Sequence, residues 1–430
     1  MLSIYGVGGD VLKQVGTGAA GLFLLGIGAA LVLAVVYAEL ASAYPYAGGD
    51  YVGVGSILGP WAGVASLAIW AAILGPGNAF TAKIIATYIE DLAPSVPTTV
   101  VTFGSLAAAV AIALLAARTS AIVTGLFLAI EMLTVCVLIG AGFWHPVRSV
   151  GDVIAHPVTL DAAGALGPVA IGSMALAAVS AAFGTCGGNQ AIAFGEELHH
   201  PHRHMGNVIL LAALIGALAI ALPVVAVVLG ASDLVSLLKS PAPFSAFMVS
   251  IAGPVAGHAM SAAVALAIFN ALIVAIMFSA RFFFSLGRDA IFLPRLNRML
   301  ASVHGTSGAP QAATLFIGLI SAACCLLSSH VLLVFLSGSF PYLLGLVSLA
   351  VLVGRSKRLT GQPGYWRSPL YPLAPILGLC LAAVLAIATL FDADAGRPSI
   401  LLLGGILIAA LLWHHFVLSR RPGGWAPRLG

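Results

Sequence analysis

The sequence predicts an all-α membrane protein with about twelve spanning helices of roughly 20 residues each. Its 430 residues are 61% hydrophobic and only 7% charged, whereas an average soluble domain is roughly 25% charged. So few charges cannot cover the surface of a soluble protein of this size, and lipid must therefore cover much of it. We expect one compact membrane domain in contact with the lipid bilayer, without a soluble domain.

Twelve hydrophobic units follow one another along the chain, each near the length of a membrane span. The first unit is short, and the sixth contains a glycine-rich interruption. Small residues such as Gly21, Gly26 and Gly28 recur in these units, and such residues allow membrane helices to approach closely. The units are residues 1–16, 19–42, 61–89, 98–117, 120–143, 165–198, 206–230, 260–286, 311–328, 330–353, 372–391 and 399–418.

The basic residues of the loops predict the orientation of the chain. If the unit 19–42 runs from outside to inside, thirteen Lys and Arg residues fall on the cytoplasmic side and three on the outer side. This positive-inside bias predicts a multi-pass protein of the cytoplasmic (inner) membrane with a cytoplasmic C-terminus. The thirteen are Arg118, Arg203, Arg281, Arg288, Arg295, Arg298, Arg355, Lys357, Arg358, Arg367, Arg420, Arg421 and Arg428; the three are Arg148, Lys239 and Arg397.

Composition and spacing also argue against several other classes of function. The net charge of +4 is weak and gives no reason to expect nucleic acid as a partner. The five cysteines lie in apolar runs without metal or disulfide spacing. We interpret the histidine-rich segment 199–204 as a solvated loop in preference to a metal site. No nucleophile–base pair falls within the spans, so we expect neither an enzyme nor any cofactor or bound metal.

The sixth unit is interrupted by the segment Gly184-Thr185-Cys186-Gly187-Gly188-Asn189. A straight helix over residues 165–198 would be about 50 Å long, against about 30 Å of bilayer hydrocarbon. Glycine and Asn are poor helix formers, so we predict that the helix unwinds here. Unwound backbone in a membrane is tolerated only where protein or a watery cavity satisfies its polar groups. Discontinuous helices of this kind hold the substrate in secondary transporters.

We predict that residues at this interruption bind the substrate. The carbonyls near Phe183 could accept from an ammonium group, and the N–H groups of the next half-helix favour a carboxylate. Phe183 would act as an aromatic gate, and Cys186 and Asn189 would line the pocket. The alternative is a glycine kink that only lets helices pack. The predicted substrate-binding residues are Phe183, Gly184, Thr185, Cys186, Gly187, Gly188, Asn189 and Trp70.

Four short motifs follow one another along the chain. They are Tyr37-Ala38-Glu39-Leu40 with Pro45, Gly48, Gly49 and Tyr51; Gly195-Glu196-Glu197-Leu198-His199-His200-Pro201-His202-Arg203; Ser279-Ala280-Arg281 with Gly287-Arg288-Asp289, Leu293-Pro294, His304 and Pro310; and Tyr365-Trp366-Arg367-Ser368-Pro369. In this order they resemble motifs of the amino acid–polyamine–organocation (APC) superfamily permeases, and the resemblance covers nearly the whole chain. Two positions depart from the family pattern: His200 stands where Asn is usual, and Ala290 where Gly is usual.

The resemblance implies a LeuT-like fold, in which helices one to five and six to ten form inverted repeats and helices one and six are broken. A small amine or amino acid would bind midway across the membrane, between the two breaks. We therefore expect a single transporter domain over residues 1–430, with the first repeat at 1–164, the second at 165–353 and two accessory helices within 372–418.

The beginning of the chain departs from the resemblance. The family's first helix carries a G-S-G-I-type break that follows a half-helix, and this break supplies N–H groups to the substrate carboxylate. Here the chain begins with Met1-Leu2-Ser3-Ile4-Tyr5-Gly6, and the segment to Gln14 resembles the outer half alone. Either the start is assigned too late or the protein lacks the first half of helix one. We favour the first reading, because loss of that half would expose the site and abolish coupling.

Two further features are candidates, one for coupling and one for gating. Glu131 lies ~17 Å along its span, close to the midplane, and acids at that depth are functional hypotheses by default. Some proton-driven relatives resemble it in carrying an ionisable residue on helix five, so we predict proton coupling at Glu131. The alternative is a permanently neutral structural acid. Glu197 is predicted to pair with Arg281 or Arg288 in an inner gate at the cytoplasmic mouth.

Together these features predict a secondary active transporter of a small amino acid, working by proton-coupled symport or by exchange, with sodium coupling as an alternative. A neutral substrate is favoured, because the pocket segment has no acid or base to pair a second charged group, and a zwitterion needs only the half-helix ends. Trp70, Phe183 and Cys186 suggest a mixed apolar pocket. The competing interpretation is a non-transporting pseudo-transporter that acts as a membrane sensor or partner protein.

Overall fold

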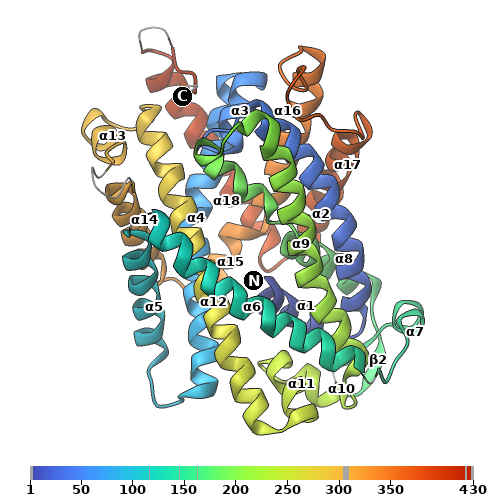
Figure 1. Cartoon of the computed structure of the whole chain (residues 1–430). Coiled ribbons are helices and arrows are strands. Elements are labelled where there is room, and N and C mark those ends of the chain that lie inside the picture. The colour runs from blue at the N-terminus through green and yellow to red at the C-terminus, as the bar shows by residue number, and fades with distance from the viewer. Residues whose placement is uncertain are drawn as a thin grey trace.

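The computed structural model describes residues 3–115, 117–144, 146–161, 163–303, 309–421 and 424–427. Within this part the protein is almost entirely helical (Figure 1). Two short strands, β1 (Val158–Leu160) and β2 (Leu166–Pro168), form a small antiparallel hairpin in which Thr159 is opposite Gly167. The predicted class, a helical membrane protein, is confirmed.

The helices alternate between long membrane-length segments and short connecting ones. In chain order they are η1 (Ser3–Val7), α1 (Gly8–Val15), α2 (Gly18–Ala43), α3 (Asp50–Leu58), α4 (Pro60–Leu92), α5 (Thr98–Ala113), α6 (Ala117–Trp144), α7 (Val150–Ala155), α8 (Ile171–Thr185), η2 (Gly188–Glu197), α9 (Pro201–Gly230), α10 (Leu234–Lys239), α11 (Pro243–Ala252), α12 (Pro254–Arg288), α13 (Pro294–Leu300), α14 (Gln311–Cys324), α15 (Ser329–Ser337), α16 (Ser339–Ser356), α17 (Leu373–Phe391), α18 (Gly396–Trp413) and η3 (His414–Leu418).

Each predicted hydrophobic unit contains helix in the structure, although the unit at 165–198 begins with the strand β2 and its helix α8 starts only at Ile171. In the described part of the chain, nine helical segments are long and apolar enough to cross a membrane. The units at 1–16, 98–117 and 311–328 correspond to shorter helices, α1, α5 and α14. The unit at 330–353 is divided at Gly338 into α15 and α16. The count of twelve spans and the inverted repeat stay predictions.

Proline and glycine fix where several long helices begin. Pro60 and Pro254 occupy the first turns of α4 and α12, where the fixed φ of proline suits the helix and its missing N–H costs nothing. The residues just before them, Gly59 and Gly253, have φ of 105° and 83°. Only glycine adopts such angles without steric cost, so each pair turns the chain sharply into a long helix.

The helix surfaces carry large apolar side chains that the protein itself does not cover. Leu126 on α6, Leu319 on α14 and Leu401 on α18 are 65%, 72% and 78% exposed. A soluble monomer rarely exposes apolar surface on this scale. These outward faces therefore suit the hydrocarbon of a bilayer, as the composition predicts.

The largest buried cluster includes residues of α2, α4, α9 and α12, so it joins both halves of the helix bundle. In one half, α2 packs along α9 and also contacts α8 and α17. In the other half, α4 contacts α12, α5 and α14. Figure 1 shows α3, α13 and the C-terminal segment at one end of the bundle, and α7, α10 and α11 at the other. The short helices therefore cover the two ends of the bundle, and the long ones run between them.

The sixth unit is interrupted where the sequence predicts it. The α-helix α8 ends at Thr185, Cys186 has extended backbone with φ −97° and ψ 113°, and a 3₁₀ helix, η2, follows from Gly188. The last carbonyls of an α-helix have no donors within the helix. The chain therefore changes its hydrogen-bonding pattern at Cys186–Gly187.

Candidate functional site

The residues that flank the interruption have different surroundings. Phe183 is 40% exposed, and its ring packs edge-on against Phe340 of α16, with 5.6 Å between the ring centroids. Thr185 is buried, and its hydroxyl donates 3.1 Å bonds to the carbonyls of Gly26 and Ala181. Phe183 is therefore the member of this pair with an accessible side chain, whereas Thr185 attaches α8 to α2.

The glycines of the interruption differ in the space around them. A Cβ added at Gly188 would lie 2.8 Å from the backbone nitrogen of Ala213, so α9 passes directly against this glycine. A Cβ at Gly184 would lie 3.1 Å from Val7 Cγ1. At Gly187, which is exposed, a Cβ would meet nothing within 4 Å. Gly188 and Gly184 thus allow close packing, whereas Gly187 borders open space.

Cys186 lies between these glycines and is half-buried. Its N–H donates a 3.3 Å bond to the carbonyl of Phe183, so that carbonyl already has one donor. The side chain of Asn189 lies outside the described part of the chain, although its backbone belongs to η2.

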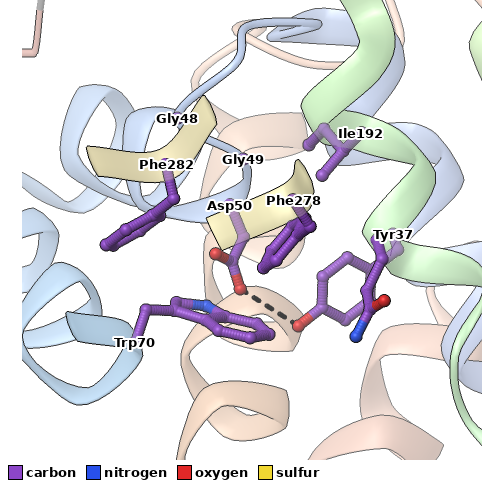
Figure 2. A pocket seen from close by; sticks show the side chains of 9 residues that line it. Tyr37, Gly48, Gly49, Asp50, Trp70, Ile192, Phe278 and Phe282 are labelled. Atoms are coloured by element: carbon purple, nitrogen blue, oxygen red, sulfur yellow. Dashed lines mark hydrogen bonds between the residues drawn. The ribbon is translucent and has the colours of Figure 1, made fainter. Parts of the chain in front are cut away.

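Trp70 lies with the segment that follows the interruption and not with Phe183. It lines a cavity of about 10 Å³, which is the space that one water molecule occupies. Figure 2 shows Trp70, on α4, beside the carboxylate of Asp50 at the start of α3. The other lining residues are Tyr37, Gly48, Gly49, Gln190, Ile192, Phe278 and Phe282.

Asp50 is the charged group of this cavity. Its carboxylate is 3% exposed and accepts a 3.1 Å hydrogen bond from the Tyr37 hydroxyl. Burial raises the pKa of Asp50 to about 6, and the favourable interactions with Tyr37 and Trp70 limit that rise. The Trp70 indole N–H is itself buried and has no partner within hydrogen-bonding distance among the described atoms. The cavity therefore combines a costly buried carboxylate with several aromatic rings.

Glu131 is buried between α6, α12 and η1. Its side chain accepts a hydrogen bond from Asn270 of α12 and interacts electrostatically with Tyr5 of η1. The Tyr5 carbonyl in turn accepts a 2.9 Å bond from the Tyr88 hydroxyl of α4. Glu131 thus lies where η1 meets α6 and α12.

Two ion pairs join η2 to α12. Arg281 donates from Nε and from a terminal nitrogen to Glu197 Oε1, at 2.9 and 2.6 Å. Arg288 donates a 3.0 Å bond to Glu196 Oε1. Of the two partners predicted for Glu197, Arg281 is the one it contacts. Glu196 also accepts a 2.9 Å bond from the Ala47 N–H, so η2 is tied to the α2–α3 connection as well.

A further carboxylate, Glu39, was not singled out from the sequence. It is fully buried near the end of α2 and accepts two bonds from Arg355, at 2.7 and 2.9 Å, in a bidentate arrangement. Thr360 Oγ1 and the Ser368 N–H add bonds of 3.0 and 3.1 Å. This carboxylate therefore holds α2, α16 and the connection to α17 together.

The four motifs meet at the same end of the bundle. Trp366 N–H donates 3.0 Å bonds to Ser42 Oγ and to the carbonyl of His202. The ring of His202 stacks on Tyr365 with 4.3 Å between centroids, and its Nδ1 lies 2.8 Å from the Ser42 carbonyl. These contacts join the first, second and fourth motif segments, and the ion pairs of Arg281 and Arg288 join the third to the second.

The two positions that depart from the family pattern share one backbone feature. His200 and Ala290 have φ of 51° and 58°, in the left-handed region. Asn and Gly adopt this region readily, and His does so more often than most residues, but Ala pays a steric cost.

Comparison with known proteins supports the resemblance seen in the motifs. A family model described as "Amino acid permease" matches residues 1–411. No curated protein matches the chain.

Proposed function

Because this chain belongs to the amino acid permease family, we propose that it moves a small neutral amino acid across the cytoplasmic membrane by proton-coupled symport or exchange. The observation that carries the proposal is the interruption at Cys186–Gly187 within a segment of membrane-spanning length. Backbone that leaves helical bonding at such a place offers polar groups to a solute.

The described side chains at the interruption favour a neutral substrate. From Phe183 to Gly188 they are one aromatic ring, one hydroxyl that already bonds to carbonyls, one thiol and glycine. The end of α8 presents carbonyls to an ammonium group, and the beginning of η2 presents N–H groups to a carboxylate. The α-ammonium and α-carboxylate of an amino acid match these two ends, and nothing in this stretch matches a third charge.

Glu131 is our candidate for the coupling group. It lies within a membrane-length segment, its oxygens face Asn270, and it lies beside the helix-one residue Tyr5. A proton on Glu131 would remove the cost of a charge at this depth, and its loss would change the interaction with Asn270. Protonation would therefore alter how the helix-one segment packs against α6 and α12.

The ion pairs Glu197–Arg281 and Glu196–Arg288 are our candidates for the inner gate. They lie on the side of the interruption that leads toward α9. Basic residues such as Arg203, Arg298 and Arg421 lie at this end of the bundle, and by the positive-inside rule they support a cytoplasmic location for it. The C-terminus would then also be cytoplasmic.

The test is uptake of labelled amino acids by the purified protein in proteoliposomes, with an imposed proton or sodium gradient. We expect accumulation of a small neutral amino acid, such as alanine, that follows the proton gradient. Failure to transport any of a full amino-acid set, by protein that remains folded, would refute the proposal and favour a sensor role.

Glu131→Gln tests the coupling group separately. We expect it to abolish accumulation driven by the proton gradient while exchange of internal for external substrate continues. Thr134→Ala is the matched control, because Thr134 lies one turn further along α6 and its hydroxyl bonds to its own helix at Ile130. An unchanged pH profile in Glu131→Gln would make Glu131 a structural acid.

A further inference from the structure

The cavity at Asp50 is separate from the residues predicted to bind substrate. It is lined by Gln190 and Ile192 of η2, one turn beyond the interruption, and by rings of α2, α4 and α12. The ion pairs of Glu196 and Glu197 lie one further turn along η2. The cavity therefore lies between the proposed substrate position and the proposed inner gate.

Asp50 differs from Glu39, Glu196 and Glu197, three other acids at this end of the protein. Glu39, Glu196 and Glu197 each pair with an arginine. Asp50 is 3% exposed, whereas the side chains of Glu196 and Glu197 are 35% and 52% exposed, and no described Lys, Arg or His forms a salt bridge with Asp50. In the described structure its carboxylate accepts a hydrogen bond from the Tyr37 hydroxyl, and the Trp70 ring lies beside it (Figure 2). A buried carboxylate without a cation is costly, and a bound cation would remove that cost.

The lining of the cavity selects the kind of cation. Trp70, Phe278, Phe282 and Tyr37 surround Asp50 with aromatic rings (Figure 2). The faces of such rings attract organic ammonium groups, and a carboxylate adds a charge-assisted hydrogen bond. A small metal ion would instead need several oxygen ligands. The space of about 10 Å³ accepts one atom the size of an ammonium nitrogen.

We propose that Asp50 and the surrounding rings form a second binding site, which holds the ammonium group of the amino acid on its way between the interruption and the cytoplasm. This inference rests on the transport function and orientation proposed above. The site holds the head group alone, and the rest of the molecule extends toward η2, where Gln190 lies. Release to the cytoplasm then requires the two ion pairs of η2 to open.

Binding of methylammonium tests the site without any transport. Thermal unfolding of the purified protein is compared in methylammonium chloride and in sodium chloride at equal ionic strength. We expect methylammonium to raise the unfolding temperature of the wild type and of Ser66→Ala, but not of Asp50→Asn. Ser66 lies on α4, one turn before Trp70, and does not line the cavity. Equal shifts in wild type and Asp50→Asn, no shift in the wild type, or an equal effect of sodium would each overturn the proposal.

Alanine exchange then tests whether the ammonium group belongs to the transported amino acid. In oriented proteoliposomes, the KM for labelled alanine is measured separately from each side. We expect Asp50→Asn to raise the cytoplasmic KM by roughly tenfold to a hundredfold, as loss of a charged hydrogen bond does, with little change in the external KM. Asp50→Glu should recover part of the loss. An unchanged cytoplasmic KM would overturn the proposal. If the wild type does not transport alanine, that result counts against the proposed transport function, and the methylammonium experiment alone then decides whether this site binds an ammonium group.

Discussion

Asp50→Asn should make the protein more stable at neutral pH. Asp50 lies in α3, outside the membrane-length helices, and burial raises its pKa from 3.8 to about 6. The folded state therefore holds the proton more tightly than the unfolded state does. Protonation favours folding, and the wild type loses stability as the pH rises from near 3.8 to about 6, after which the loss is constant.

The size of the effect follows from the same shift. A rise of roughly two pKa units corresponds to about 3 kcal/mol, which is the largest gain expected from Asp50→Asn at pH 7.5. Near pH 4.5 the gain should fall to about 1 kcal/mol, because the wild-type carboxyl is then protonated in the folded state. The retained side-chain oxygen of Asn can still accept the hydrogen bond from Tyr37.

Equilibrium unfolding in bicelles at pH 4.5, 6 and 7.5 measures this difference. The control is Asp394→Asn, which removes an exposed carboxylate and should change stability little at any of these pH values. If Asp50→Asn and the wild type have the same stability and the same pH dependence, the reasoning about the buried charge is refuted. If the variant is stabilised, Asp50 is a group whose charge costs stability, as expected of a site that binds a cation.

Three further substitutions test the packing around the site. Arg355→Ala leaves the fully buried Glu39 without its cation and should cost about 3–5 kcal/mol, seen as a lower unfolding temperature; an unchanged temperature would contradict the buried pair. Gly188→Ala forces a Cβ to within 2.8 Å of the α9 backbone and should destabilise the fold by about 1–3 kcal/mol, which lowers the yield of folded protein in size-exclusion profiles. Gly187→Ala is the control and should give the wild-type yield; equal yields of the two variants would refute the packing argument. Ala290→Gly relieves the left-handed conformation at φ 58° and should stabilise by up to about 1 kcal/mol, measured by the same unfolding assay, and a loss of stability would refute it.

The positions of the long helices could be predicted because the length of an apolar run can be read from the sequence without knowing which residues pack together. The interruption after Thr185 was predictable for the same reason, since glycine weakens a helix wherever it stands. The division at Gly338 and the short helices α3, α10, α11 and α13 were not predicted. Their ends depend on caps and on packing against distant residues, which local hydrophobicity does not report.

The candidate site was predictable in part. The sequence predicted a partner for Glu197 in either Arg281 or Arg288 without deciding between them, and Glu131 attracts attention because a charge at that depth is costly. Asp50 was not predicted as a site residue, although it lies between Gly49 and Tyr51 of the first motif. Only 7% of the residues are charged, so an acid that follows two glycines and precedes an apolar run could have been recognised as a candidate site residue. Its cavity could not be foreseen, because Trp70 and Phe278 come from helices remote in sequence.

The two sides of η2 are attached by different kinds of interaction. Toward α12 it is held by charge pairs whose carboxylates are 35% and 52% exposed, so dissolved salt weakens them. Beyond His200, the first turn of α9 is fixed to α2 and to the Trp366 segment by hydrogen bonds that involve backbone groups. A displacement of η2 would therefore separate it from α12 and rotate it about residues 198–200. The α2–α9 side, together with the chain leading into α17, would stay in place as the fixed support for that motion.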